Sequence, residues 1–251
     1  MPIEPITLNS RSVHLAAEVH WPEDDEEAPW PAVIVCHGLG SRKENHASFA
    51  AYLAREGFVG LLLDGRGHGA SEGSLDENVL DDVGAALSYL QSCREVDTTR
   101  IAVRGSSMGG YLALWAGVRY PAVGAVVAIC PASGEMLARA LGSRDFWLSA
   151  GQMEGPRARV ALPDFHRFLA AHDAAEAAAR LAPRPLFLIH GLRDEVVPYQ
   201  HSEALYALAG EPKRLWLLPA ATHRDAQQDP AVHAETVRWL RRAMPRRGLG
   251  T

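Results

Sequence analysis

The chain of 251 residues has little of several features that would place it in a specialised class. It has three cysteines, an odd number without metal-ligand spacing, which argues against a disulfide framework and a zinc site. No apolar run approaches the roughly 20 residues of a membrane helix. The net charge of −5 argues against a general nucleic-acid binder, which needs a basic face. What remains is an ordinary globular protein, with 47% hydrophobic and 22% charged residues.

The beginning of the chain also lacks a targeting pattern. Residues 1–5 contain no basic region followed by an apolar stretch, so we expect no secretory signal. Cys36 and Cys130 lie in apolar runs, where a reduced cysteine behaves as a small hydrophobe. We therefore expect a cytoplasmic protein with free thiols, either a monomer or a homodimer.

The elements that are present alternate along the chain. Residues 3–22 alternate in polarity around the polar stretch 9–12, which predicts a β-hairpin. Beyond it come short continuous apolar runs, the pattern of parallel strands that are covered on both faces. These runs are Ala32–Cys36, Val59–Leu63, Ile101–Val103, Ala125–Ile129, Leu186–Ile189 and Leu215–Leu218.

Segments with helical periodicity separate the apolar runs. They are Ala47–Arg55, Val79–Leu90, Tyr111–Arg119, Ser202–Leu208 and Val232–Arg242. Strands that alternate with helices form parallel sheets through right-handed crossovers. The sequence therefore predicts a single α/β domain over residues 1–251, with a mostly parallel, doubly wound sheet and the N-terminal hairpin as its antiparallel edge.

One stretch interrupts this alternation. Between Pro131 and Pro183 there is no strand pattern, only helix-prone sequence such as Ala170–Leu181. The stretch is too long for an ordinary loop. We expect a small helical cap, inserted at about residues 132–182 over the strand ends.

The pentapeptide Gly105-Ser106-Ser107-Met108-Gly109 lies between a strand run and a helical segment. Gly-x-Ser-x-Gly in this context is a nucleophile elbow, a sharp turn that forces its central serine into a strained conformation. The hydroxyl then stands at a helix N-terminus, which favours developing negative charge. We therefore predict that Ser107 is a nucleophile.

A serine nucleophile needs a base to take its proton and an acid to orient that base. In a parallel sheet these partners lie in loops just after strands. Asp194 and His223 follow the last two strand runs, in the chain order serine, acid, histidine. Each also has a plainer interpretation, Asp194 as a turn residue and His223 as a solvated loop side chain. Glu195 is the alternative acid.

Acyl transfer further needs two hydrogen-bond donors for the oxyanion. The backbone N–H of Met108, which follows the nucleophile, is one candidate, and that of Leu39, in the loop after the first parallel strand run, is the other. His37 and His190 open His-Gly turns at strand ends, and we expect them to shape the backbone. No histidine pair has the His-Glu-x-x-His spacing, so we predict no metal, and no cofactor is indicated.

This combination resembles the α/β-hydrolase family, in its serine esterase branch. The resemblance rests on His37-Gly38, the loop from Asp64 to Gly69, the elbow at Ser107, Asp194 before Val197-Pro198, and His223. It implies a triad of Ser107, Asp194 and His223, with Leu39 and Met108 as oxyanion hole. Within the family the chain is most similar to small, short-capped carboxylesterases, including relatives of cinnamoyl (feruloyl) esterases and dienelactone hydrolases. It differs from dienelactone hydrolases, in which the nucleophile is typically cysteine.

The function we expect is hydrolysis of a small-molecule carboxylic ester through an acyl-enzyme. A thioesterase and a serine aminopeptidase need the same triad and stay open as alternatives, as does a binding protein without hydrolytic activity. Several apolar side chains of the insertion are candidates for a wall around the substrate, or equally for packing of the cap onto the core. They are Phe146, Trp147, Met153, Phe165 and Phe168.

Overall fold

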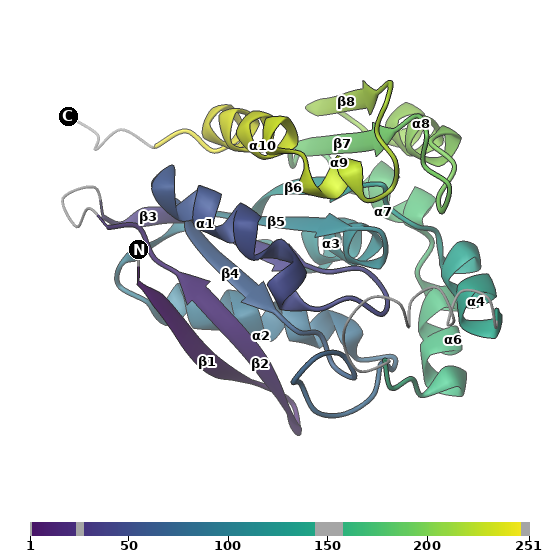
Figure 1. The fold of residues 1–251 in the computed structure, drawn as a ribbon, viewed down its shortest axis with the longest axis horizontal. Coiled ribbons are helices and arrows are strands. Elements are labelled where there is room, and N and C mark those ends of the chain that lie inside the picture. Colours follow the sequence, from purple (N-terminus) through teal and green to yellow (C-terminus); the bar gives the residue numbers. More distant parts are fainter. Residues whose placement is uncertain (1, 24–27, 144–157, 247–251) are drawn as a thin grey trace.

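A computed structural model describes residues 2–23, 28–143 and 158–246 of the chain, and its centre is an eight-stranded sheet (Figure 1). The strands are β1 (Ile3–Ser10), β2 (Val13–His20), β3 (Trp30–Cys36), β4 (Val59–Leu63), β5 (Val96–Ser106), β6 (Val123–Ile129), β7 (Leu186–Gly191) and β8 (Lys213–Leu218). Their spatial order is β1-β2-β4-β3-β5-β6-β7-β8. The β1–β2 hairpin and its junction with β4 are antiparallel, and every other pairing is parallel. The predicted fold class is confirmed.

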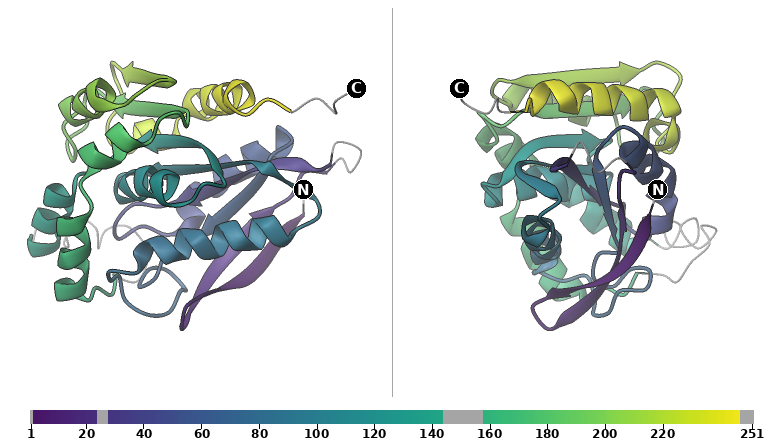
Figure 2. Two further views of the ribbon diagram at one scale, coloured as in Figure 1. Left: turned by 180° about the vertical axis from the view of Figure 1, so that it is seen from behind. Right: turned by 90° about the vertical axis from the view of Figure 1, so that its left-hand side faces the viewer.

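Helices cover both faces of the sheet. The described α-helices are α1 (Ala47–Arg55), α2 (Val79–Ser92), α3 (Met108–Arg119), α4 (Gly134–Gly142), α6 (Leu162–Ala171), α7 (Ala174–Arg180), α8 (Gln200–Leu208), α9 (Asp225–Gln228) and α10 (Pro230–Ala243). Helices α1, α9 and α10 pack on one face, and α2, α3, α7 and α8 on the other (Figure 2). Within the described residues, no helix has the length and apolar character needed to cross a membrane.

Strand β3 shows why the apolar runs are continuous. Val33 and Val35 belong to the core beneath α1 and α10, whereas Ile34 and Cys36 belong to the core beneath α2 and α3. Successive side chains of a strand point to opposite faces, so a strand with two covered faces has no solvent-facing position. Every residue of β3 is accordingly buried.

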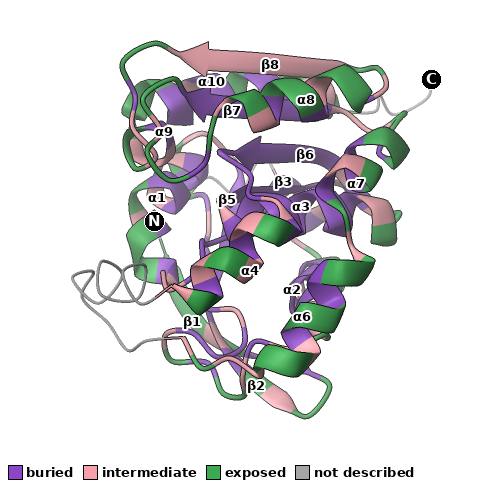
Figure 3. Cartoon of the chain, turned by 90° about the vertical axis from the view of Figure 1, so that its right-hand side faces the viewer, coloured by how far each residue is buried: buried purple, intermediate pink, exposed green. Residues whose placement is uncertain are grey.

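The insertion between β6 and β7 contains α4, α6 and α7, of which α4 and α6 lie at the carboxyl end of the parallel strands and expose their outer surfaces (Figure 3). The Ser133 hydroxyl caps α4 by accepting from the N–H of Met136 at 3.1 Å. Within the helix-prone stretch, Asp173 caps α7 by accepting from the N–H of Ala175 at 2.7 Å. The expected helix over residues 170–181 is therefore divided between α6 and α7.

Arg159 attaches the insertion, near its middle, to the loop after β4. Its backbone N–H donates to the carbonyl of Gly67, and its carbonyl accepts from Leu75, both at 2.8 Å. Its guanidinium donates to the carbonyls of Gly73 and Ser71. Gly67 has φ +75°, and a Cβ there would lie 2.3 Å from the Arg159 carbonyl oxygen. Only glycine allows this approach.

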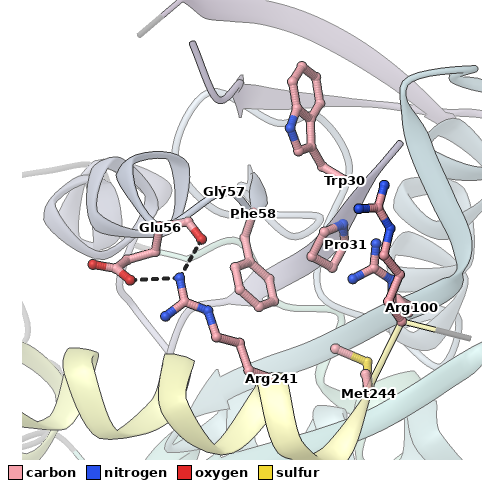
Figure 4. A pocket seen from close by; sticks show the side chains of 9 residues that line it. Trp30, Pro31, Glu56, Gly57, Phe58, Arg100, Arg241 and Met244 are labelled. Atoms are coloured by element: carbon pink, nitrogen blue, oxygen red, sulfur yellow. Dashed lines mark hydrogen bonds and ion pairs between the residues drawn. The ribbon is translucent and has the colours of Figure 1, made fainter. Parts of the chain in front are cut away.

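A hollow of about 380 Å³ opens at the opposite end of the strands, where β3 begins (Figure 4). Trp30, Phe58 and Arg100 line it, together with Arg241, which donates to the backbone and side-chain oxygens of Glu56 at 2.9 and 2.8 Å. Those bonds tie α10 to the end of α1. None of the predicted catalytic residues lies in this hollow.

Candidate active site

Ser107 occupies the turn between β5 and α3 with φ 56° and ψ −119°. This left-handed conformation is uncommon for a residue with a side chain and marks a strained position. The neighbouring glycines are required by contact. A Cβ on Gly105 would lie 1.9 Å from the carbonyl oxygen of Gly109, and a Cβ on Gly109 would lie 2.1 Å from that of Cys36. The strand, the helix and the end of β3 therefore pack too closely for larger residues.

Asp194 and His223 meet directly. Nδ1 of His223 lies 2.6 Å from Oδ2 of Asp194, whose side chain is fully buried. The backbone N–H groups of Val196 and Val197 both donate to Oδ1 at 2.8 Å. Nε2 of His190 lies 3.2 Å from Oδ2. Burial alone disfavours the charged carboxylate, but the hydrogen bonds from His190, His223 and Val197 hold the pKa of Asp194 well below its ordinary value.

The loop that carries His223 is ordered by short polar contacts. The Thr222 hydroxyl donates to Asp225 Oδ2 at 2.7 Å, and the Asp225 N–H returns a bond to that hydroxyl at 3.2 Å. The side-chain amide of Gln227 donates to the His223 carbonyl at 2.9 Å. The Glu195 carboxylate accepts from the backbone N–H of His223 at 3.4 Å and so contacts the peptide rather than the ring. Asp194 is the acid that faces the imidazole.

Ser107 and the Asp194–His223 pair flank the end of β6. The Ser107 N–H donates to the carbonyl of Ile129 at 2.9 Å. On the other side, Sγ of Cys130, a carboxylate oxygen of Asp194 and a ring nitrogen of His223 lie within 4.8 Å of one another. Because Nδ1 of His223 is engaged by Asp194, Nε2 is the ring nitrogen left to accept a proton. Of the three residues predicted from chain order, Asp194 and His223 are in direct contact, and Ser107 is bonded to the neighbouring end of β6.

The Cys130, Asp194 and His223 set has donor types that bind metals. Burial, followed by the nearby Asp194 carboxylate, raises the pKa of the Cys130 thiol well above its ordinary value. A protonated thiol is a poor ligand, since metals bind the thiolate. Asp194 and His223 are moreover already paired, so we interpret the set as an acid–base pair beside a neutral thiol.

The loop after β3 lies against the elbow. A Cβ on Gly38 would lie 3.2 Å from Cβ and 3.8 Å from Oγ of Ser107, so this backbone borders the nucleophile closely. Leu39 follows as a buried residue, and the loop closes with the Ser41 N–H donating to the Gly38 carbonyl at 3.1 Å. Met108 begins α3, where the first N–H groups have no partner within the helix. Both predicted oxyanion donors therefore lie in segments next to Ser107.

His37 holds this loop in place. Its Nε2 accepts from the N–H of Gly65 at 3.0 Å, so Nδ1 carries the proton and donates to the carbonyl of Gly38 at 2.8 Å. Burial lowers the pKa of His37, which keeps the ring neutral. The expectation that His37 shapes the backbone agrees with these contacts.

His190 has a different environment from the one we expected. Its ring is fully buried, and besides Asp194 it contacts the carbonyl of Val197 through Nε2 at 2.9 Å and the hydroxyl of Ser202 through Nδ1 at 2.6 Å. No sequence pattern connects Ser202, on α8, with Asp194. The spacing of four residues between His190 and Asp194 was the available signal, and it is ambiguous in a loop.

Phe165 and Phe168 of α6 are buried, at 0% and 2% exposure. Their rings stack at a centroid distance of 5.8 Å, and Phe168 meets Tyr111 of α3 edge to face. The two side chains thus pack the insertion onto α3, and a substrate-facing role for them stays a prediction. Phe146, Trp147 and Met153 lie outside the described residues.

A model of the prolyl oligopeptidase family matches residues 45–246. The chain belongs to this family, and its fold is that of the α/β hydrolases, as the resemblance implied.

Two relatives by sequence and one solved structure illustrate the relationship. YfhR of Escherichia coli (strain K12) is 31% identical over 198 residues, which cover 78% of this chain and 64% of YfhR, so the chain spans less than two thirds of that relative. The putative esterase YitV of Bacillus subtilis is 26% identical over 238 residues, 87% of this chain and 91% of YitV. Est1E of Butyrivibrio proteoclasticus, solved with ferulic acid bound, superposes with a TM-score of 0.75 at 20% identity, covering 95% of this chain and 97% of Est1E.

Proposed function

We propose that the chain is a serine esterase that uses Ser107 as nucleophile, His223 as base and Asp194 as orienting acid. The observation that carries the proposal is the 2.6 Å contact between His223 Nδ1 and the buried Asp194 carboxylate, next to a serine held at φ 56°. The similarity to the putative esterase YitV supports an ester substrate. The fold shared with Est1E is compatible with an aromatic acyl group.

In this mechanism His223 Nε2 takes the proton of Ser107 as the hydroxyl attacks the ester carbonyl. The N–H groups of Leu39 and Met108 stabilise the oxyanion, and loss of one such donor typically costs about 10²–10³ in kcat. The protonated His223 then gives its proton to the leaving alcohol, which leaves an acyl-enzyme. Water, deprotonated by the same ring, releases the acid. The negative Asp194 stabilises the imidazolium in both halves.

We propose that the insertion at about residues 132–182 acts as a cap and determines the substrate range. Its candidate substrate contacts are Phe146, Trp147, Met153, Phe165 and Phe168. A cytoplasmic location and a small-molecule substrate are part of the same proposal.

Peptide-bond cleavage is the second candidate, because the family to which the chain belongs is named for a peptidase. An aminopeptidase needs the same triad, so only substrates separate the two. A thioesterase is a third use of the site, and a ligand-binding protein without turnover is the non-enzymatic alternative.

Ser107→Ala tests the proposal. We expect the wild type to hydrolyse p-nitrophenyl esters with a higher kcat/KM than aminoacyl p-nitroanilides or acyl-CoA, and to react covalently with a fluorophosphonate. Ser107→Ala should lose both properties, while the adjacent control Ser106→Ala retains them. Full ester hydrolysis by Ser107→Ala would refute the assignment, and preference for the anilides would favour the peptidase.

A further inference from the structure

His190 has contacts that the proposed triad does not use. It is the next-to-last residue of β7, and its fully buried ring touches three groups, the Asp194 carboxylate, the Val197 carbonyl and the Ser202 hydroxyl. Ser202 is also fully buried. Buried polar atoms without partners are costly, so this set of contacts defines the hydrogen positions closely.

The contacts fix the tautomer of the ring. The Val197 carbonyl and the Asp194 carboxylate only accept hydrogen bonds, so Nε2 of His190 must carry the proton that it shares between them at 2.9 and 3.2 Å. In the neutral ring Nδ1 then accepts from the Ser202 hydroxyl at 2.6 Å. The hydroxyl thereby holds the ring in the form that donates to Asp194.

Oδ2 of Asp194 therefore receives two imidazole donors, one from His223 and one from His190. Each donor draws negative charge from the oxygen, and each restricts rotation of the carboxylate. We propose that His190, oriented by Ser202, is a positioning residue that holds Asp194 and limits its pull on the proton of His223. The proposal rests on the proposed triad.

Other titratable groups face the same place. The Cys130 thiol approaches Asp194 from the end of β6, Glu195 accepts from the His223 backbone, and His201 of α8 lies near His190. Burial and the proximity of His190 lower the pKa of His201. Burial keeps the Cys130 thiol protonated through the working range of pH. Within the described residues, His190 is the side chain besides His223 whose ring donates to Asp194.

His190→Leu removes the donor and keeps an apolar side chain of similar length. Asp194 then has His223 as its one imidazole donor, so the acid limb of the kcat/KM profile should move to higher pH. We expect kcat to fall about 10-fold to 100-fold with KM unchanged, the range that corresponds to a hydrogen bond to a charged group. His190→Gln restores an N–H donor toward Asp194 and an oxygen toward Ser202, and should return both quantities toward wild type. Ser202→Ala should shift the limb in the same direction by less.

His46→Leu is the matched control. His46 is another buried histidine, at 2% exposure, with no contact to Asp194, so its removal should change stability but leave the acid limb in place. An unmoved limb in a folded His190→Leu protein, or a His190→Gln protein as impaired as His190→Leu, would overturn the proposal. If His190→Leu does not fold, the comparison of His190→Gln with Ser202→Ala carries the same test.

A second measurement does not depend on turnover. The proton between His223 and Asp194 should give a low-field ¹H NMR resonance, and its pH titration follows the His223 ring directly. We expect the midpoint to rise in Ser107→Ala/His190→Leu compared with Ser107→Ala, and to return in Ser107→Ala/His190→Gln. If the wild type hydrolyses no ester but this shift occurs, the proposed function fails while the positioning role stands. If the enzyme hydrolyses esters but the midpoint is unchanged, the positioning role of His190 fails while the proposed function stands.

Discussion

The same dipeptide, His-Gly, directly follows strand β3 and forms the end of strand β7, and these two His-Gly corners hold their rings in opposite tautomers. His37 accepts at Nε2 from the Gly65 N–H and donates from Nδ1 to its own loop. His190 donates from Nε2 to Val197 and Asp194 and contacts Ser202 through Nδ1. The first corner thus shapes the loop next to Ser107, and the second reaches Asp194, the proposed orienting acid. The partner that each ring meets, rather than the dipeptide, decides its role.

We expect the largest effect on kcat from replacement of Asp194, the carboxylate that His190 contacts in the second corner. Asp194→Asn places an amide where two imidazole N–H groups need an acceptor, so His223 should adopt the wrong tautomer. We expect kcat on a p-nitrophenyl ester to fall by about 10⁴. Glu195→Gln, one residue along, contacts only a backbone N–H and should stay within a few fold of wild type. Comparable losses in the two variants would remove the distinction between these acids.

The glycines of the two corners, Gly38 and Gly191, should differ in how much free energy of unfolding is lost when each is replaced by alanine. A Cβ on Gly191 would lie 2.2 Å from the carbonyl oxygen of Ala221. Gly191→Ala must therefore displace the backbone at Ala221, two residues ahead of His223 in the chain. We expect a loss of about 2–4 kcal/mol in the free energy of unfolding, measured in urea. A Cβ on Gly38 would meet the Ser107 side chain at 3.2 Å, a contact that small shifts relieve. Gly38→Ala should cost less than about 1 kcal/mol while reducing kcat. The reverse order of stabilities would contradict this account.

Removal of the His37 ring should affect the stability of the fold more than the pH dependence of kcat/KM. His37→Leu leaves the Gly65 N–H and the Gly38 carbonyl without their partner, which we expect to cost about 1–3 kcal/mol of unfolding free energy. Its kcat should decrease because the loop next to Ser107 loses its support. The acid limb of kcat/KM should stay at the wild-type position, in contrast to His190→Leu. A shift of that limb in His37→Leu would contradict the view that only the His190 corner affects the pH dependence.

The smallest effect concerns acid stability near the first corner. Burial lowers the pKa of His37, and burial with the neighbouring His37 lowers that of His68 to about 3. The unfolded chain protonates such rings near pH ~6.5, so unfolding takes up protons below that pH and stability falls as the pH falls. Each ring contributes up to about 1.4 kcal/mol per pH unit. His68→Gln should therefore reduce the slope of unfolding free energy between pH 6 and 5, and an unchanged slope would be inconsistent with a neutral buried His68.

Chain order allowed Asp194 and His223 to be paired in advance, because loops that follow parallel strands meet at one edge of the sheet. The strands themselves were evident because buried parallel strands are continuously apolar, as in β3. The helix α9 escaped prediction, since four residues are too few to show a period. The role of His190 was also hidden, because it depends on Ser202, which only tertiary folding brings to the ring. Packing of Phe168 against Tyr111 likewise follows from how the insertion docks.

Arg159 attaches the insertion, near its middle, to the loop after β4. All of its acceptors there, on Gly67, Ser71 and Gly73, are backbone carbonyls, which a residue of any type supplies. Apart from Gly67, the residues of that loop can therefore change without loss of these acceptors. For protein engineering, this makes Arg159 the residue to retain when the insertion is exchanged between relatives in search of a new substrate specificity.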